Sequence, residues 1–334
     1  MNGKRIASGK ATTKLRTANG GMTVADVVAL AICIVVLVMT IAMLVGCSKE
    51  KSTRSVYYWR TTLSLDSTER AFIEENGVSK IYCRYFDVVM DDNGEPMPNA
   101  TISFEDTFPH NTKVVPVVYI LNDCMKDAHD GLAKMIFERI RKMNDTNGIH
   151  GTKEIQIDCD WSQSTKKNFF TFMSDLQRLC HSNEMRLSAT IRLHQLGQPA
   201  PPCDRGVLMM YNTGDVTKLS VCKPILDIHD VQPYMRYLKS YDLSLSTAYP
   251  LFSWRVLFRG DKYVGIMHGD DDLPVLPGDS IAERQPTSED ILQTQRAVDK
   301  VRPDANNEII LYDLSRENIK RFKRLDYENF YKEH

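Results

Sequence analysis

Short apolar runs rich in β-branched and aromatic residues recur from residue 56 to the end of the chain. Runs of this length and composition predict β-strands. Eight of them can be marked along the sequence, at residues 56–59, 80–89, 113–121, 154–161, 186–196, 206–212, 243–254 and 308–314.

Amphipathic stretches separate most of these runs and predict helices. They cover residues 67–75, 126–142, 164–180, 225–238 and 288–301, and one more follows the last run at 316–331. The connections after the second and fifth runs show no clear helix. The first of these, residues 90–108, is rich in Asn, Asp and Pro and predicts a loop.

Strands that alternate with helices predict a parallel sheet. Eight such units in about 280 residues agree with a (β/α)₈ TIM-like barrel, which we place at residues 55–334. A doubly wound open sheet is the alternative. No GxGxxG or GxxxxGK[ST] motif occurs at a strand-to-helix turn, so the usual signal for nucleotide phosphate binding is absent.

The N-terminal segment has a different pattern. Residues 1–23 carry five basic residues and no acid, and an apolar run at 24–45 follows. Twenty-two residues make about 33 Å of helix, enough to cross a bilayer. A basic leader before such a run stays in the cytoplasm, so we expect the rest of the chain to be exported.

The apolar run ends in Leu44-Val45-Gly46-Cys47, which resembles a bacterial lipobox. The resemblance implies a signal segment at residues 1–46, lipidation of Cys47, a polar tether at 47–54, and a membrane-anchored lipoprotein of the bacterial cell envelope that faces away from the cytoplasm. An uncleaved signal anchor is the alternative.

Composition and charge narrow the partners. With 43% apolar and 25% charged residues, the bulk of the chain has the proportions of a globular protein. Without residues 1–46 the formal net charge falls from −1 to −5, since five basic residues and one acid are lost. This favours neither nucleic-acid binding nor a basic membrane-binding surface. Beyond Cys47, scattered single cysteines predict buried thiols rather than bridges or metal ligands.

The fourth predicted strand has the most informative pattern. Strand alternation puts Glu154, Gln156, Asp158 and Asp160 on one face and Ile155, Ile157, Cys159 and Trp161 on the other. The apolar face suits packing against helices, so the polar face should point into the barrel. Two carboxyl groups about 7 Å apart raise each other's pKa, which favours acid–base chemistry.

Asp158-Cys159-Asp160-Trp161 resembles the fourth-strand DxxDxDxE motif of chitinase-type, family 18 glycoside hydrolases. In that family the final Glu donates a proton and the preceding Asp orients the substrate's acetamido group. Asp158 and Asp160 fill the two middle positions, but Ile155 replaces the first Asp and Ser162 replaces the Glu. The sixth strand, Leu208 to Asn212, is similar to the family's M-x-Y-D segment, with Asn212 in place of Asp.

The exported part also resembles an uncharacterised family of bacterial barrel lipoproteins related to glycosidases. The resemblance rests on residues 82–87 and 156–160 and spans most of 55–315. Together the two resemblances imply a glycoside hydrolase-like protein. If it is catalytic, Asp160 would be the proton donor in place of the missing Glu, Asp158 the electrostatic partner and Tyr211 a positioning hydroxyl.

Other strand ends supply candidate substrate-binding residues, because function gathers at the carboxyl ends of barrel strands. They are Arg84, Asp87, Arg192, His194, Asn212, Tyr249, Trp254 and Asp313. The aromatic residues offer stacking surfaces for sugar rings. The alternative interpretations are a structural salt-bridge network for the charged residues, a barrel hydrogen bond for His194 and a core position for Trp254.

The expected partner is therefore an oligosaccharide or polysaccharide, with a membrane contact through the lipid anchor. We expect no cofactor and no metal, and the acidic segment at 268–272 is interpreted as a solvated turn. A non-catalytic glycan-binding or envelope scaffold protein is the competing class, and a metal-dependent hydrolase that uses the Asp pair is a third.

Overall fold

The computed structural model describes residues 28–34, 36, 52–267 and 272–332. The chain divides into two units, residues 1–50 and 51–334. In the first unit, the described residues are helical and exposed. Among the described residues, no helix is both long and apolar enough to cross a membrane. Most of the predicted signal segment lies outside the described residues, and so does Cys47.

Eight parallel strands form a closed barrel in the second unit. Strand β1 pairs in parallel with both β3 and β14, and this pairing closes the ring. The predicted TIM-like barrel is confirmed, and the open sheet is excluded. The strands are β1 (Thr53–Tyr58), β3 (Lys80–Met90), β6 (Lys113–Ile120), β7 (Glu154–Cys159), β8 (Arg186–Arg192), β9 (Arg205–Met209), β10 (Leu245–Pro250) and β14 (Glu308–Tyr312).

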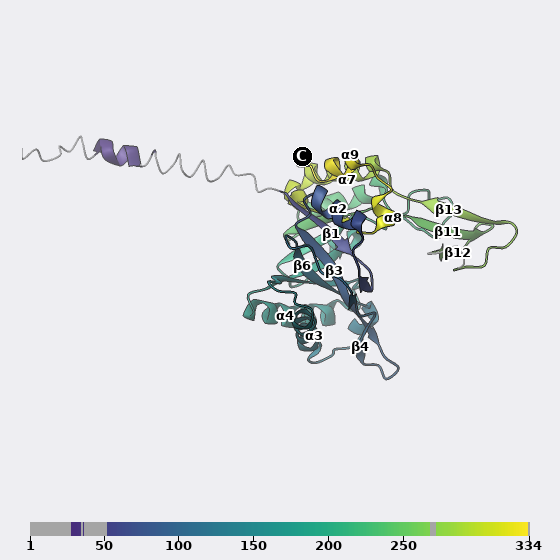
Figure 1. Cartoon of the computed structure of the whole chain (residues 1–334), viewed down its shortest axis with the longest axis horizontal. Helices are drawn as coiled ribbons and strands as arrows, with labels where there is room; N and C mark the ends of the chain where they lie inside the picture. Colours follow the sequence, from purple (N-terminus) through teal and green to yellow (C-terminus); the bar gives the residue numbers. More distant parts are fainter. Residues whose placement is uncertain (1–27, 35, 37–51, 268–271, 333–334) are drawn as a thin grey trace, which may run out of the picture. The chain divides into compact units, whose positions relative to one another are not determined.

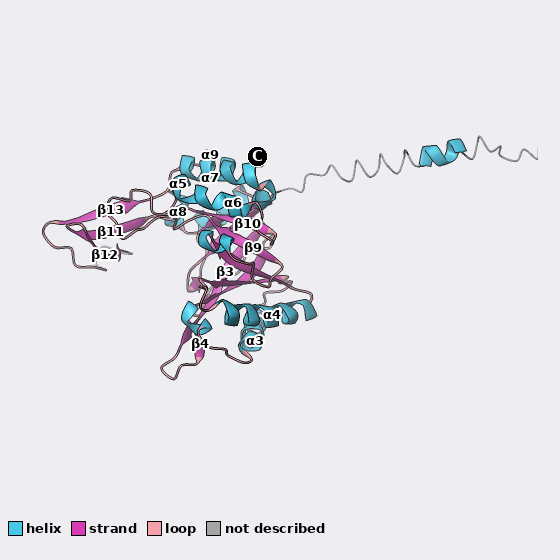
Figure 2. Ribbon diagram, turned by 180° about the vertical axis from the view of Figure 1, so that it is seen from behind, coloured by secondary structure: helices cyan, strands magenta, loops and turns pink. Residues whose placement is uncertain are grey.

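Helices flank the barrel on opposite sides (Figures 1 and 2). Helices α3 (Leu132–Thr146) and α4 (Lys166–Ser182) lie on one side, and α2 (Ser67–Glu75), α7 (Ser288–Val301) and α9 (Arg324–Phe330) lie on the other. The connection after β8 holds only a 3₁₀ turn, Leu193–Gly197, as the sequence predicts.

Two predicted helices are interrupted. The segment predicted at 225–238 forms α5 (Ile228–Val231), a 3₁₀ turn at Gln232–Tyr234 that contains Pro233, and α6 (Met235–Leu238). Proline has no N–H to donate to the preceding turn, which explains the break. The segment at 316–331 forms α8 (Arg316–Ile319) and α9, and the Tyr327 hydroxyl of α9 donates a hydrogen bond to the carbonyl of Ile319, the last residue of α8.

Several strands lie outside the barrel. The predicted loop at 90–108 contains β4 (Pro96–Asn99), which pairs with the outer end of β3, and β5 (Ser103–Phe104), which pairs with β2 (Thr62–Leu63). A three-stranded antiparallel sheet, β11 (Trp254–Arg259), β12 (Lys262–Met267) and β13 (Asp279–Arg284), projects from the barrel (Figure 1). Trp254, predicted at the end of a barrel strand, is instead the first residue of β11, and this sheet was not predicted from the sequence.

The apolar core lies mostly between barrel and helices. On β7, Ile155, Ile157 and Cys159 belong to this layer, as alternation predicts. Trp161 joins them and stacks on Phe169 with ring centroids 6.0 Å apart. Inside the barrel a smaller cluster is built around Tyr57 and Tyr82. The described cysteines are all free. Of those beyond Cys47, Cys83, Cys124, Cys159 and Cys180 are buried as predicted, whereas Cys203 is partly buried and Cys222 is exposed.

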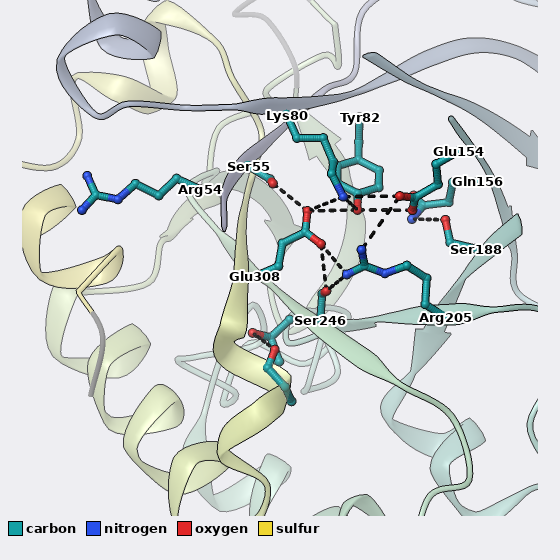
Figure 3. A network of polar contacts seen from close by, with 12 residues as sticks. Arg54, Ser55, Lys80, Tyr82, Glu154, Gln156, Ser188, Arg205, Ser246 and Glu308 are labelled. Atoms are coloured by element: carbon teal, nitrogen blue, oxygen red, sulfur yellow. Dashed lines mark hydrogen bonds and ion pairs between the residues drawn. The ribbon is translucent and has the colours of Figure 1, made fainter. Parts of the chain in front are cut away.

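A charged network fills the barrel interior where the strands begin (Figure 3). Lys80 Nζ lies 3.0 Å from Glu308 Oε1 and 3.3 Å from Glu154 Oε2, and Arg205 forms ion pairs with both acids. Burial opposes ionisation of Glu308, but Arg205 and Lys80 outweigh it and lower its pKa to about 2. At this end of a barrel such groups serve stability.

Candidate functional site

The carboxyl ends of the barrel strands surround a cavity of about 880 Å³. A second cavity, of about 510 Å³, lies on the outer face between α3 and α4 and contains no residue singled out from the sequence. Ten of the eleven predicted catalytic and substrate-binding residues line the larger cavity: Arg84, Asp87, Asp158, Asp160, Arg192, His194, Tyr211, Asn212, Trp254 and Asp313.

Asp158 is buried and held by the neighbouring strand. Its Oδ1 accepts hydrogen bonds from Thr190 Oγ1 at 2.6 Å and from Arg192 Nη2 at 2.9 Å. Thr190 and Arg192 are two residues apart on β8, so both side chains point into the barrel. Since β7 and β8 are parallel neighbours, this contact fixes the Asp158 carboxylate.

Asp160 follows the last residue of β7, and its side chain is 56% exposed. Its Oδ1 lies 4.0 Å from Arg192 Nε and 3.7 Å from His194 Nε2. Arg192 therefore lies within 4.0 Å of both carboxylates of the pair.

Arg192 connects these two carboxylates. Burial acts to lower its pKa, but Asp158, Tyr211 and Asp160 outweigh burial and raise it, so the guanidinium stays charged. Its Nη1 is buried and has no hydrogen-bond partner among the described residues.

A β-bulge brings Asp87 to the cavity. The register between β3 and β6 shifts between Arg84 and Phe86, so Tyr85 has no partner on β6. The extra residue reverses the alternation, and Arg84 and Asp87 point the same way although they are three positions apart. Arg84 Nε donates to Asp87 Oδ1 at 2.8 Å, and Nη2 donates to Oδ2, which makes a bidentate pair.

Aromatic side chains form another part of the cavity lining. Tyr211 stacks on Tyr312 with centroids 5.0 Å apart, and Trp59 lies 5.7 Å from Tyr312. Phe252 contacts Tyr312 at 5.8 Å and Trp254 at 5.4 Å. We call these five residues the aromatic wall.

Trp59, Phe252 and Tyr119 line the cavity but were not among the predicted site residues. Each lies at or just after the end of a barrel strand. The signal that selected Trp254, an aromatic residue at a strand end, applied equally to Trp59.

The Tyr211 hydroxyl donates to the sulfur of Met209 at 2.9 Å. Burial raises the pKa of Tyr211, against the opposing effect of Arg192, so the hydroxyl stays protonated and remains a donor. A positioning role for Tyr211 needs this neutral form.

Asp313 follows the last residue of β14 and is partly buried. Its Oδ1 accepts a hydrogen bond from the side-chain amide of Asn318, a residue that also lines the cavity. Burial raises the pKa of Asp313 to about 6, against Asn318 and Arg60, which both lower it.

The prediction that Tyr249 binds substrate is wrong. Tyr249 is fully buried, lies outside the cavity and donates a hydrogen bond to Asn306 Oδ1 at 2.9 Å. Its neighbour Ala248 points into the barrel, so alternation directs Tyr249 to the helix layer, where it packs in the core. It has no surface to offer a sugar.

Ser162, at the position of the family's acid, also lies outside the cavity. Its Oγ is 2.8 Å from Ser164 Oγ in the turn before α4. Residues 268–271 of the acidic turn lie outside the described residues. Within the described ranges, no three His, Cys, Asp or Glu side chains gather as a metal site requires.

Comparison with solved structures gives the same fold. A chitinase from Chromobacterium violaceum ATCC 12472 superposes with a TM-score of 0.57 at 10% identity, over 84% of this chain and 98% of that chain. The spore cortex-lytic enzyme SleL of Bacillus megaterium QM B1551 gives 0.54 at 10% identity, over 84% and 74%. The Ostrinia furnacalis Group IV chitinase, solved in complex with allosamidin, gives 0.51 at 9% identity, over 84% and 97%.

No protein-family model matches the sequence, and no curated protein matches it significantly. The structural likeness therefore establishes a glycoside hydrolase-like barrel fold, and function has to be argued from the cavity itself.

Proposed function

We propose that this protein is a glycoside hydrolase-like protein that binds an N-acetylated glycan at the carboxyl-terminal mouth of its barrel and hydrolyses it weakly. The observation that carries the proposal is the 880 Å³ cavity, which combines carboxylates with an aromatic wall. Sugars present apolar ring faces and a polar rim, so a site with both kinds of surface suits them. The barrel fold shared with chitinases and a cortex-lytic enzyme supports this substrate class.

Each side chain has a role in this proposal. Asp158, fixed by Thr190 and Arg192, is the electrostatic partner of the positive charge that develops on the sugar. Tyr211 supplies a neutral hydroxyl for positioning, and Arg84, Asp87, Arg192, His194, Asn212, Trp254 and Asp313 contact the glycan. Proton donation by Asp160 stays a prediction of the motif.

Weak activity follows from the missing glutamate. Ser162 cannot donate a proton at neutral pH, and a donor displaced by about 1 Å loses roughly a hundredfold in rate. General acid catalysis itself contributes about 10² to 10⁴. The replacement of this glutamate by Ser162 also favours the alternative, a non-catalytic glycan-binding or envelope scaffold protein.

Isothermal titration calorimetry and product analysis test this function on the full chain in detergent. Oligosaccharides of N-acetylglucosamine, glycan strands of peptidoglycan and allosamidin are the probes. We expect saturable binding, slow release of shorter sugars, and an unchanged response for Asp175→Asn, an exposed carboxylate on α4. Binding without turnover would support the scaffold alternative, and no binding to any probe would contradict the proposal.

We further propose that Cys47 is lipidated and anchors the protein to the outer face of a bacterial cell membrane. The lipobox-like sequence at 44–47 and the basic leader support this. Cys47→Ser should abolish metabolic labelling with palmitate and leave an uncleaved precursor. The matched control is Cys33→Ser, which changes the cysteine within the apolar run at 24–45 and should label normally. Equal labelling of both variants would contradict a Cys47 anchor.

A further inference from the structure

The carboxyl groups of the cavity differ in their partners. Asp158 contacts Arg192, Asp87 is paired bidentately with Arg84, and Asp160 lies within 4.0 Å of both Arg192 and His194. A cationic partner stabilises the charged form of a carboxyl, so an ion-paired carboxylate is a poor place to store a proton. Asp313 is in no ion pair with a described residue, and its side chain is held by the neutral amide of Asn318.

The surroundings of Asp313 are aromatic on one side and charged on the other. Tyr312 precedes it on β14 and stacks on Tyr211 of the segment after β9. Arg60, after β1, is the basic group that acts on it, but Arg60 is already paired with Glu69 of α2 at 2.8 Å. Glu69 acts on the pKa of Asp313 in the opposite direction and so offsets part of the effect of Arg60.

Asp313 and Asp158 share a neighbour. Both carboxyl groups line the same cavity as Tyr211, and Tyr312, the residue before Asp313, stacks on Tyr211 with ring centroids 5.0 Å apart. Asp158 is held by Thr190 and by an ion pair with Arg192, whereas Asp313 is in no ion pair with a described residue. Two carboxyl groups in different environments around one site are the usual arrangement for acid and electrostatic partner in glycoside hydrolysis.

We propose that Asp313 is the proton donor of this site, in place of the acid missing at Ser162. This rests on the proposed function. In the step, the O–H bond of the Asp313 carboxyl breaks and its proton goes to the glycosidic oxygen. The C1–O bond breaks with its electron pair leaving on that oxygen, and the charge on C1 is stabilised by Asp158. A water molecule then adds its oxygen to C1 and returns a proton to Asp313.

A raised proton affinity near neutrality gives this role a pH signature. A donor must be protonated, so kcat/KM should fall as the pH rises above about 6, the pKa that burial gives Asp313. Asp313→Asn is nearly isosteric and keeps the oxygen that accepts from Asn318, so the fold should survive the change.

The test compares two substrates and two variants of the full chain. One substrate is an N-acetylglucosamine oligosaccharide, which needs a proton on its leaving group, and the other is the 2,4-dinitrophenyl glycoside, whose leaving group departs unprotonated. We expect Asp313→Asn to lose about 10² to 10⁴ in kcat on the first and less than about fivefold on the second. The decline above pH 6 should disappear. In Asp160→Asn, kcat should fall by the same factor on both substrates, and the fall of kcat/KM above pH 6 should remain.

Asn318→Ala gives a second, independent result. Loss of the amide that stabilises the Asp313 carboxylate should move the decline to higher pH. Asp175→Asn should leave both profiles unchanged.

The outcomes separate the two proposals. If the wild-type chain turns over neither substrate, the proposed hydrolase activity fails and the donor role falls with it. A second case is an active wild type together with an Asp313→Asn variant that keeps the fall of kcat/KM above pH 6 and loses the same factor in kcat on both substrates. In that case only the assignment of Asp313 is overturned. If instead Asp160→Asn loses kcat on the oligosaccharide but not on the 2,4-dinitrophenyl glycoside, Asp160 is the proton donor.

Discussion

The two ends of this barrel use the same residue types in opposite ways. Where the strands begin, Glu154 and Glu308 face Lys80 and Arg205, and hydroxyl groups fill the remaining positions (Figure 3). Where the strands end, aspartates face Arg84, Arg192 and His194 around an open cavity. The difference shows that charge inside a barrel is not by itself a sign of function.

The two charged clusters differ in how far their side chains are buried. In the network at the strand starts two acids balance two bases, and the side chains of all four are largely buried. At the mouth, by contrast, the side chains of Asp160 and His194 are 56% and 60% exposed. Buried, ion-paired groups hold a structure together, whereas exposed charged groups in a cavity remain available to a ligand.

The largest expected effect comes from breaking the closed network. Glu308→Gln leaves Lys80 and Arg205 with Glu154 as their remaining carboxylate, so it should lower the free energy of unfolding by about 3–5 kcal/mol. Urea unfolding measures this. Asp160→Asn at the mouth is the matched change and should cost less than about 1 kcal/mol, because the side chain is exposed. Equal costs would contradict the contrast between the two ends.

Acid should act on the same network. The pKa of Glu308 lies below its ordinary value of 4.5, at about 2, so the stability it contributes is complete above about pH 4.5 and is lost as the pH falls through about 2. The loss should approach about 3 kcal/mol, at 1.36 kcal/mol for each unit of pKa. Denaturation followed at a series of pH values measures it. In Glu308→Gln this part of the pH dependence should be absent.

At the mouth, loss of Asp158 should affect activity and binding together. Asp158→Asn removes the carboxylate that holds Arg192, so we expect kcat to fall about 10²-fold, with weaker glycan binding. Asp160→Asn, the matched variant, should leave binding within a few-fold. Steady-state kinetics and calorimetry separate these effects. Unchanged glycan binding in Asp158→Asn would mean that Asp158 is not needed to hold Arg192 in position for the glycan.

The smallest effect should come from the aromatic wall. Trp254→Ala removes one stacking surface and should weaken glycan binding about five- to tenfold, or about 1 kcal/mol, with little change in unfolding. Tyr249→Phe is the control, because Tyr249 lies outside the cavity and its hydroxyl contacts Asn306. If both variants bind the oligosaccharide normally, the wall is not a sugar platform.

The sequence by itself determined the features that depend on neighbouring residues. The bounds of α2 and α7 agree with prediction because both begin with a capping box, Asp66 with Glu69 and Thr287 with Asp290. By contrast, α3 starts six residues later than predicted, after Gly131, which has no side chain to mark the start. Alternation on β7 likewise gave the inward direction of Asp158.

Tertiary structure decided the features that depend on distant residues. A bulge against β6 turned Asp87 toward the cavity, and core packing took Tyr249 away from it. Trp59 contacts Tyr312 because the barrel closes between β1 and β14, and Phe252 contacts it because β10 pairs with β14. Strand period and helix caps are local properties of a sequence, whereas register, closure and the burial that raises the pKa of Asp313 arise only when remote segments pack together.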